Sequence, residues 1–338
     1  MKIQNFVYLF LLLLASCSSD PLNVDVSDIE INMTSIRLDQ AVFEADWNSD
    51  LNQYSLLEDK YGDYLSFYSG FILNNPMNVS DLESNLIMKR FAEDPTMKGF
   101  YTSIQELYGG DKFNIYFDEV KQAFRYYSFY FPEERTPNLV LYQSGFNYKI
   151  VPNDTLIGIG LEWYLGPENQ FVKKLSNQAF PQFEKNKMKA EFLTVDAVKG
   201  FLKVKYQGEM EMDNFLSVII FYGKIQYLTD ALLQQKSDAS KMNYSDLEFD
   251  WMQKNEKEVW TYMAENKLLF ENDLRLITQW VNDGPFTNGL PQESPSRVGI
   301  YMGWQIVKQY MKKNPDVSMK ELLQNKDYNA FLSAYKPK

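Results

Sequence analysis

The second half of the chain is predicted to be helical, because its apolar residues recur at helical spacing. Residues 215–232 (FLSVIIFYGKIQYLTDAL) are apolar nearly all round in their first half, which predicts a central, buried helix. Ser245 and Glu248 form a capping-box pattern that opens a second helix. Ser294 is a good N-cap and Pro295 suits the first helical position, so a further helix is expected to begin there.

The helix expected after Pro295 has one apolar stripe and two small residues. Gly299 and Gly303 are four positions apart and would let this helix pack closely against a neighbour. The stripe that we expect to be buried consists of Ile300, Trp304, Val307 and Met311.

The middle of the chain has short apolar runs that are typical of strands. Residues 138–143 (NLVLYQ) and 155–165 (TLIGIGLEWYL) are expected to be strands, and residues 29–39 an opening strand followed by a helix from about Gln40. Aromatic-rich helices are expected around residues 61–71, 82–91 and 113–127. The predicted fold is therefore α+β and predominantly helical. It is one globular domain over residues 29–338, with strands mainly at about 138–173 and a helical C-terminal half at 213–335.

One face of the run 155–165 carries two glycines. Gly158, Gly160, Glu162 and Tyr164 alternate with a more apolar set, so they are expected to share a face. Two glycines leave that face bare, which would let another backbone or a ligand approach closely. A helix that packs over the glycines is the alternative.

The N-terminus has the features of a lipoprotein signal peptide. The apolar run at residues 6–15 is too short to span a bilayer comfortably and follows a lysine. It ends in Leu14-Ala15-Ser16-Cys17, which looks like a bacterial lipobox, and Cys17 is the only cysteine of the chain. We expect a signal peptide at residues 1–16, lipidation of Cys17 and a tether at residues 17–28. An ordinary signal peptide that is cleaved elsewhere is the alternative.

Composition excludes several classes of function. The 338-residue chain has a net charge of −11, which disfavours nucleic acid as a partner. It contains no histidine, which removes Ser-His-Asp and Cys-His catalysis and the HExxH zinc site. No dinucleotide-binding or P-loop sequence is present, and no cofactor, metal or small-molecule substrate is expected. A catalytic carboxylate pair stays open, because 45 acidic residues make such pairs common.

Three charged residues occupy unfavourable positions in the predicted helices. Arg297 falls in a first turn, where the helix dipole disfavours a cation. Glu256 lies within an apolar stripe, and Lys224 lies on the mostly apolar helix at 215–232. We expect the three to share one polar cluster in which Glu256 pairs with Arg297. The alternative is a local pair of Arg297 with Glu293 or Asp283.

Several motifs resemble the gliding-motility lipoprotein GldB family of the Bacteroidetes. They are GLEWYLG (160–166), FYGKIQYLTD (221–230), NEKEVWTYM (255–263) and above all DGPFTNGLPQESPSRVGIYMGWQIVKQYM (283–311). The family usually has Asp where Glu162 stands. The resemblance implies a role in gliding and in the envelope machinery that gliding shares with type IX secretion. The weakly acidic segment after Cys17 then favours an outer-membrane anchor that faces the periplasm rather than the cell surface.

The same regions are more distantly similar to predicted zinc-dependent peptidases. That similarity implies a zincin-like body whose metal site has been lost, because FYGKIQY stands where HExxH would lie. Lys224 would occupy the space of the cation, and Glu256 or Glu258 would be the remaining ligand. Together with Glu162, Arg297 and Tyr301, these residues form the candidate cleft or polar cluster.

Two classes of function therefore stay open. The first is a lipid-anchored, non-catalytic envelope protein that binds protein partners of the gliding and secretion machinery. The second is a lipoprotein hydrolase or peptidase with an unusual metal site or a carboxylate-based site. The absence of histidine favours the first class.

Overall fold

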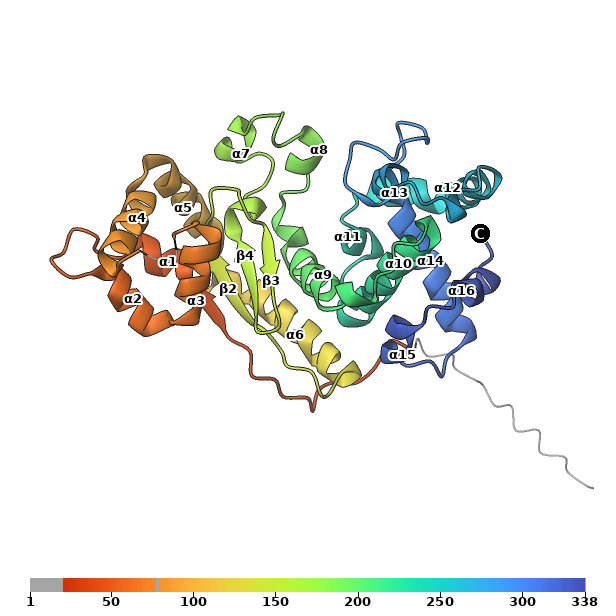
Figure 1. Cartoon of the computed structure of the whole chain (residues 1–338), viewed down its shortest axis with the longest axis horizontal. Coiled ribbons are helices and arrows are strands. Elements are labelled where there is room, and N and C mark those ends of the chain that lie inside the picture. The colour runs from red at the N-terminus through yellow and green to blue at the C-terminus, as the bar shows by residue number, and fades with distance from the viewer. Residues whose placement is uncertain (1–20, 77–78, 338) are drawn as a thin grey trace, which may run out of the picture.

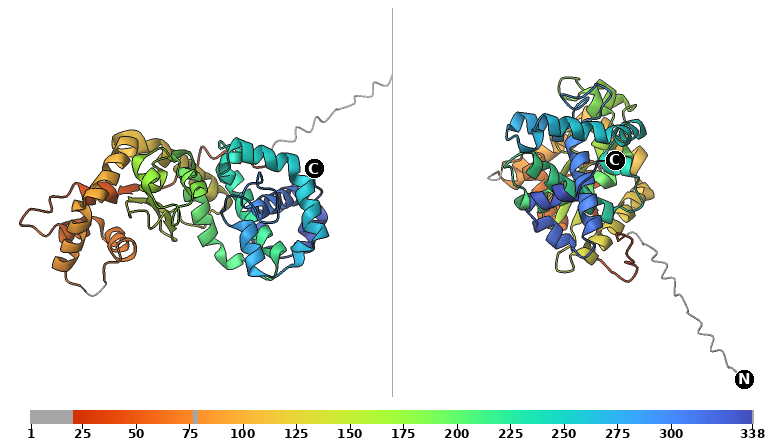
Figure 2. Two further views of the ribbon diagram at one scale, coloured as in Figure 1. Left: turned by 90° about the horizontal axis from the view of Figure 1, so that it is seen from above. Right: turned by 90° about the vertical axis from the view of Figure 1, so that its right-hand side faces the viewer.

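The N-terminal helices, a small central sheet and the C-terminal helices follow one another along the long axis of the molecule (Figures 1 and 2). The structure, a computed structural model, describes residues 21–76 and 79–337. Most of these residues are helical and only four short strands are present among them, which confirms the predicted helix-rich α+β fold. Within the same ranges no helix combines the length and the apolar character needed to cross a bilayer.

The sheet has the strand order β1-β2-β4-β3. Neighbouring strands among β1, β2 and β4 run parallel, and β3 pairs antiparallel with β4. The prediction at 138–143 is confirmed by β2, whereas the opening strand is much shorter than expected because α1 already begins at Leu38. The strands are β1 (Ser35–Arg37), β2 (Asn138–Tyr142), β3 (Ile150–Pro152) and β4 (Leu156–Gly160).

The two faces of the sheet belong to two different hydrophobic cores. Leu139 and Ile157 point into the large core of the middle and C-terminal helices. Val140 and Tyr142 point into a smaller core under the N-terminal helices. Because side chains alternate along a strand, β2 contributes to both cores and is buried on both faces, as is usual for parallel strands.

The glycine face of β4 is covered and offers no room for a ligand. The chain turns into a 3₁₀ helix (Leu161–Tyr164) directly after Gly160, so the alternation expected up to residue 165 ends there. The ring of Tyr142 and the carbonyl groups of Tyr148 and Val151 occupy the space beside the two glycines. Of the two occupants that a bare face would admit, a backbone or a ligand, the structure shows a backbone beside the glycines.

In the N-terminal part, the short helices up to α4 pack on one side of the sheet, whereas α5 and the long helix α6 contribute to the large core (Figure 1). Of the expected aromatic-rich helices, residues 82–91 lie in α4 and 113–127 almost wholly in α6, whereas 61–71 is divided among three elements. The helices are α1 (Leu38–Phe43), α2 (Gln53–Tyr61), α3 (Asp63–Ser66), a π-helix (Phe67–Ile72), α4 (Asp81–Glu93), α5 (Pro95–Tyr108), a 3₁₀ helix (Gly110–Phe113) and α6 (Asn114–Tyr130).

The middle and C-terminal helices surround α10. They are α7 (Gln170–Lys174), α8 (Gln182–Lys185), α9 (Leu193–Lys205), α10 (Phe215–Leu232), α11 (Asp238–Met242), α12 (Asp246–Glu265), α13 (Leu274–Val281), α14 (Val298–Lys313), α15 (Met319–Gln324) and α16 (Tyr328–Ala334). Further 3₁₀ turns are Ala190–Phe192, Gln207–Glu209 and Leu268–Phe270.

Helix α10 is the buried centre of this half, as predicted, and α14 packs directly on it. Seventeen of its eighteen residues, all but Tyr222, are buried. The expected close packing of α14 is confirmed, since a side chain at Gly303 would overlap the carbonyl of Ile219, and one at Gly223 would overlap Gly303 itself. The predicted stripe of α14 is buried, and the Ser245 capping box opens α12 as expected.

Candidate functional site

The loop before α14 ends at Arg297, which is the N-cap of that helix. Arg297 has a left-handed backbone (φ 60°, ψ 28°), and the helix begins at Val298. The predicted start at Ser294 and Pro295 is therefore wrong. Instead of a serine cap, the Val298 amide donates to Thr287 Oγ1 (3.3 Å), whose hydroxyl donates to the Pro295 carbonyl (2.9 Å).

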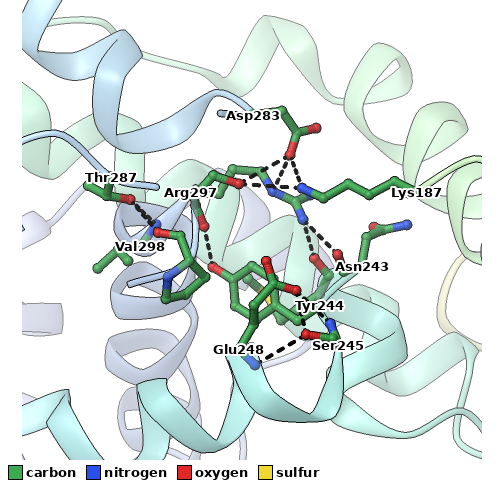
Figure 3. A network of polar contacts seen from close by, with 12 residues as sticks. Lys187, Asn243, Tyr244, Ser245, Glu248, Asp283, Thr287, Arg297 and Val298 are labelled. Atoms are coloured by element: carbon green, nitrogen blue, oxygen red, sulfur yellow. Dashed lines mark hydrogen bonds and ion pairs between the residues drawn. The ribbon is translucent and has the colours of Figure 1, made fainter. Parts of the chain in front are cut away.

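The side chain of Arg297 binds the C-terminal end of α11. Its Nη2 donates to the carbonyl oxygens of Met242 (2.6 Å) and Asn243 (3.2 Å), and its Nε lies 3.0 Å from Asp283 Oδ1 (Figure 3). The last carbonyls of a helix have no partner within the helix and carry its negative dipole end, so they favour a buried cation. The expected pair with Glu256 does not form, and Asp283 of the alternative is the carboxylate partner.

Other side chains bind the same helix end. Lys199 Nζ donates to the carbonyl of Lys241 (2.6 Å) and to Asn243 Oδ1 (3.2 Å), and Gln226 Nε2 donates to the Lys241 carbonyl (3.2 Å). Asn243 is the left-handed C-cap of α11. The turn from α11 into α12 is thus tied to α9, to α10 and to the loop before α14.

Positively charged side chains outnumber carboxylates around the C-terminal end of α11. Asp283 bridges Arg297 and Lys187. Burial alone would raise the pKa of Asp283, but Arg297 and then Lys187 outweigh it and hold that pKa well below 3.8. Burial, with repulsion from Arg297, lowers the pKa values of Lys187 and Lys203, and that of Lys199 most of all.

The geometry of this cluster supports a structural role, in which hydrogen bonds connect separate elements of the fold. A lysine with a lowered pKa can serve as a base or nucleophile when a substrate reaches it. Lys199, however, is buried, and both of its acceptors belong to the α11 end. Tyr244 adds a further link by donating to the Ser296 carbonyl (2.6 Å), and its ring lies 5.4 Å from the Arg297 guanidinium carbon.

Lys224 serves another helix end in the same way. Its Nζ donates to the carbonyls of Leu323 (3.2 Å) and Asn325 (2.5 Å) at the C-terminus of α15 and lies over the ring of Phe331. Burial lowers the pKa of Lys224 to about 8, although Glu209 and Glu211 act in the opposite direction. The three expected members of one cluster, Lys224, Glu256 and Arg297, therefore have separate partners.

Glu256 binds two tyrosines rather than a cation. Tyr335 donates to Glu256 Oε1 (2.8 Å) and Tyr301 to Oε2 (3.4 Å), so the structure brings together Glu256 and Tyr301 of the predicted set. Burial and the neighbouring carboxylate raise the pKa values of both phenols, which keeps them protonated donors.

Glu162 lies apart from these residues, at the sheet. Its Oε1 accepts from the amide (2.7 Å) and the hydroxyl (2.6 Å) of Ser144 and from the Phe146 amide (3.0 Å). Burial raises the pKa of Glu162 and outweighs these hydrogen bonds. The carboxylate thus holds the turn after β2, which connects towards β3.

Two of the predicted site residues are not among the buried residues that the structure describes. Glu258 is exposed on α12. Cys17 and the predicted signal peptide lie outside the described residues. Residues 21–28 of the expected tether are described, and Val26 among them is buried against the large core. No group of three or more potential metal ligands is found among residues 21–76 and 79–337.

One known protein family matches this chain. The family model described as gliding motility protein GldB matches residues 19–337, almost the whole sequence. The chain belongs to the GldB family. This confirms the resemblance drawn from the sequence motifs, and it supports a lipid-anchored envelope protein. No curated protein and no solved structure matches it, so the fold itself has no comparison.

The longest GldB-like motif, residues 283–311, supplies both members of the Arg297–Asp283 ion pair. It contains Asp283, Arg297 and most of α14. The main acceptors of Arg297 could not be predicted from the sequence, because backbone carbonyls leave no trace in side-chain patterns. Lys199 could have been found, since it lies between Val195 and Leu202 on the buried face of α9, as Lys224 lies on α10.

Proposed function

We propose that this member of the GldB family is a lipid-anchored, non-catalytic envelope protein that is required for gliding motility. It acts together with the motility machinery that is linked to type IX secretion. Acyl chains on Cys17 hold it to the outer membrane, with the body in the periplasm. The observation that carries the proposal is the family match across residues 19–337, which spans the whole described body.

The geometry of the buried charges supports a non-catalytic role. Arg297, Lys199 and Lys224 each donate to carbonyl groups at helix ends, and Glu162 accepts from a turn. Glu256 is occupied by two phenols. A general base must lie within hydrogen-bond reach of a substrate, whereas these groups form hydrogen bonds that join elements of the fold. The one carboxylate oxygen among them without a hydrogen-bond partner, Glu162 Oε2, is itself buried.

The zincin-like ancestry of the body stays a prediction. Helix α10 is the element to which the resemblance assigns the lost zinc motif, and under that proposal Lys224 would occupy the space of the cation. A hydrolase built on Glu256 would be the alternative function. In Glu256→Gln the amide oxygen can still accept from one tyrosine and the amide nitrogen can donate to the other phenol oxygen. This variant should therefore leave gliding intact, whereas loss of gliding by a stably folded variant would favour the enzyme.

The anchor is tested by acyl labelling in the native cell. Cys17→Ser should abolish incorporation of labelled palmitate and leave an uncleaved or mislocalised precursor. Normal labelling of this variant would contradict the anchor. Intact cells should protect the wild-type protein from added protease, and ready digestion would instead place the body at the cell surface.

A further inference from the structure

A large cavity opens where the described chain begins. It has a volume of about 1340 Å³ and lies between α10, α14 and both ends of the described chain. Pro21 and Leu22 line it on one side and Lys336 and Pro337 on another. Gln234 of the segment after α10 donates to the Leu22 carbonyl, which fastens the incoming chain beside the cavity.

The cavity is basic although the protein as a whole is acidic. Five lysines line it, against two aspartates, Asp230 and Asp238, in a chain with a net charge of −11. The lysines are Lys241, Lys308, Lys312, Lys313 and Lys336. Both aspartates already contact lysines of the cavity. Among the described residues, no carboxylate contacts Lys312, Lys313 or Lys336, and these three lysines are exposed at the rim.

The interior of the cavity combines apolar surface with a buried polar group. Tyr227, Met311 and Pro315 contribute apolar atoms. Asp230 accepts from Trp304 Nε1 (2.6 Å) through Oδ2, while its buried Oδ1 has no hydrogen bond and lies 3.3 Å from Lys241 Nζ. Burial raises the pKa of Asp230 to about 6. An amphipathic molecule with an anionic end would match an apolar interior with a lysine rim.

The position of the cavity relative to the anchor decides which anionic molecule it meets. Pro21 is four residues after Cys17, and four residues span at most about 14 Å when fully extended. If Cys17 carries acyl chains, the mouth of the cavity is held close to the headgroups of the same leaflet. Lysines within a Debye length of an anionic leaflet are attracted to it.

We infer that this cavity binds the phosphate-bearing headgroups of anionic lipids in the leaflet that holds the anchor. Lys308, Lys312, Lys313 and Lys336 contact the phosphates, and the apolar wall between α10 and α14 receives the adjoining part of the lipid. The contact orients the body on the membrane and adds a second attachment to the acyl chains. This inference rests on the lipid anchor of the proposed function.

The test measures how accessible each lysine is on a membrane. Full-length acylated protein is purified from envelopes and inserted into preformed vesicles of phosphatidylcholine, or of equimolar phosphatidylcholine and phosphatidylglycerol. A water-soluble amine reagent then labels the lysines, and mass spectrometry quantifies each site. In the anionic vesicles at low salt, labelling of Lys312, Lys313 and Lys336 should fall by roughly fivefold, a factor within the attraction of one lysine to an anionic leaflet.

Salt and variants separate headgroup binding from other effects. An ionic strength of about 1 M, where the Debye length is about 3 Å, should restore the labelling. Lys312→Glu/Lys313→Glu should abolish the protection of Lys308 and Lys336. The matched control is Lys173→Glu/Lys174→Glu, which changes two exposed lysines in the last turn of α7 and should leave the protection unchanged.

Three outcomes would overturn the inference. Equal labelling in the two kinds of vesicle would exclude headgroup binding. Protection by inorganic phosphate in phosphatidylcholine vesicles would show that the ligand is a soluble anion. Protection that survives the Lys312→Glu/Lys313→Glu change would place the contact elsewhere. Because the intact mass of the same sample reports acylation, failure of the anchor is distinguished from failure of the cavity.

Discussion

Arg297 is held where the carbonyl end of α11 meets the start of α14. Its side chain neutralises one helix end while its backbone begins another. The side chain of Lys224 binds the carbonyl end of α15, and Lys199 shares the α11 end with Arg297. At the residue scale, the buried cations therefore stabilise helix termini rather than pair with buried carboxylates.

A double-mutant cycle separates the partners of Arg297. Arg297→Met should destabilise the protein by about 3 kcal/mol, because the Met242 and Asn243 carbonyls lose a charged donor. Its coupling with Asp283→Asn should be about 1 kcal/mol, since the Asp283 side chain is 50% exposed and solvent screens the pair. The measurement is the free energy of unfolding from denaturant titrations.

The control for this cycle is Glu256→Gln, whose partners are two tyrosines. The losses from Arg297→Met and Glu256→Gln should add without coupling. A coupling of Arg297 with Glu256 as large as that with Asp283 would contradict the contacts described here.

Because the pKa of Lys224 is lowered in the folded protein, the free energy of unfolding should increase at alkaline pH. Its pKa is about 8 in the folded protein and near 10.5 in the unfolded chain, so between these values the unfolded state binds more protons. The contribution of Lys224 to the free energy of unfolding should rise by roughly 3 kcal/mol from pH 8 to 10.5. It is measured as the difference between wild type and Lys224→Met across that range.

An exposed lysine is the control for this pH series. Lys320→Met, on the surface of α15, should leave the pH dependence unchanged. A wild-type profile parallel to that of Lys224→Met would show that Lys224 is not buried as a charged group.

Sequence analysis identified the unusual residues but not their partners. The position of Arg297 beside a helix start, and of Glu256 and Lys224 among apolar residues, was visible from spacing alone, and all three are buried. The acceptors of Arg297 and Lys224 are carbonyls of Met242, Leu323 and Asn325, and the donors to Glu256 are hydroxyls of distant tyrosines. Spacing along one helix contains no information on which other helix end lies opposite.

At the scale of elements, long periodic helices were predicted well and short ones poorly. Helix α10 has the predicted bounds, and α12 begins at the predicted capping box. The parallel strand β1 and the antiparallel β3 are three residues long, too short for a pattern of alternation to define them. The start of α14 was misplaced because the Ser294-Pro295 signal was overridden by the tertiary contacts of Thr287 and Arg297.

The contact between α10 and α14 requires its glycines. Gly303→Ala would drive a methyl group into the Ile219 carbonyl and should destabilise the protein by about 3 kcal/mol or more. The matched control is Gly70→Ala, in the π-helix at Phe67–Ile72, where an added methyl group meets nothing within 4 Å. It should be neutral or stabilising by up to about 1 kcal/mol. Equal melting temperatures for the two variants would contradict the close packing.

At the scale of the whole molecule, the two faces of the sheet join an N-terminal helical layer to a larger C-terminal one. The GldB family match covers both layers. The basic cavity lies at the end of the molecule where the chain leaves towards Cys17.

The gliding speed of single cells on glass tests the proposed function most directly. A strain that lacks the gene should not glide, and the wild-type gene should restore normal speed. The Cys17→Ser variant should not restore gliding when its protein is present at wild-type abundance, because the body is then no longer held at the membrane. Normal gliding by the deletion strain, or full restoration by Cys17→Ser, would contradict the account.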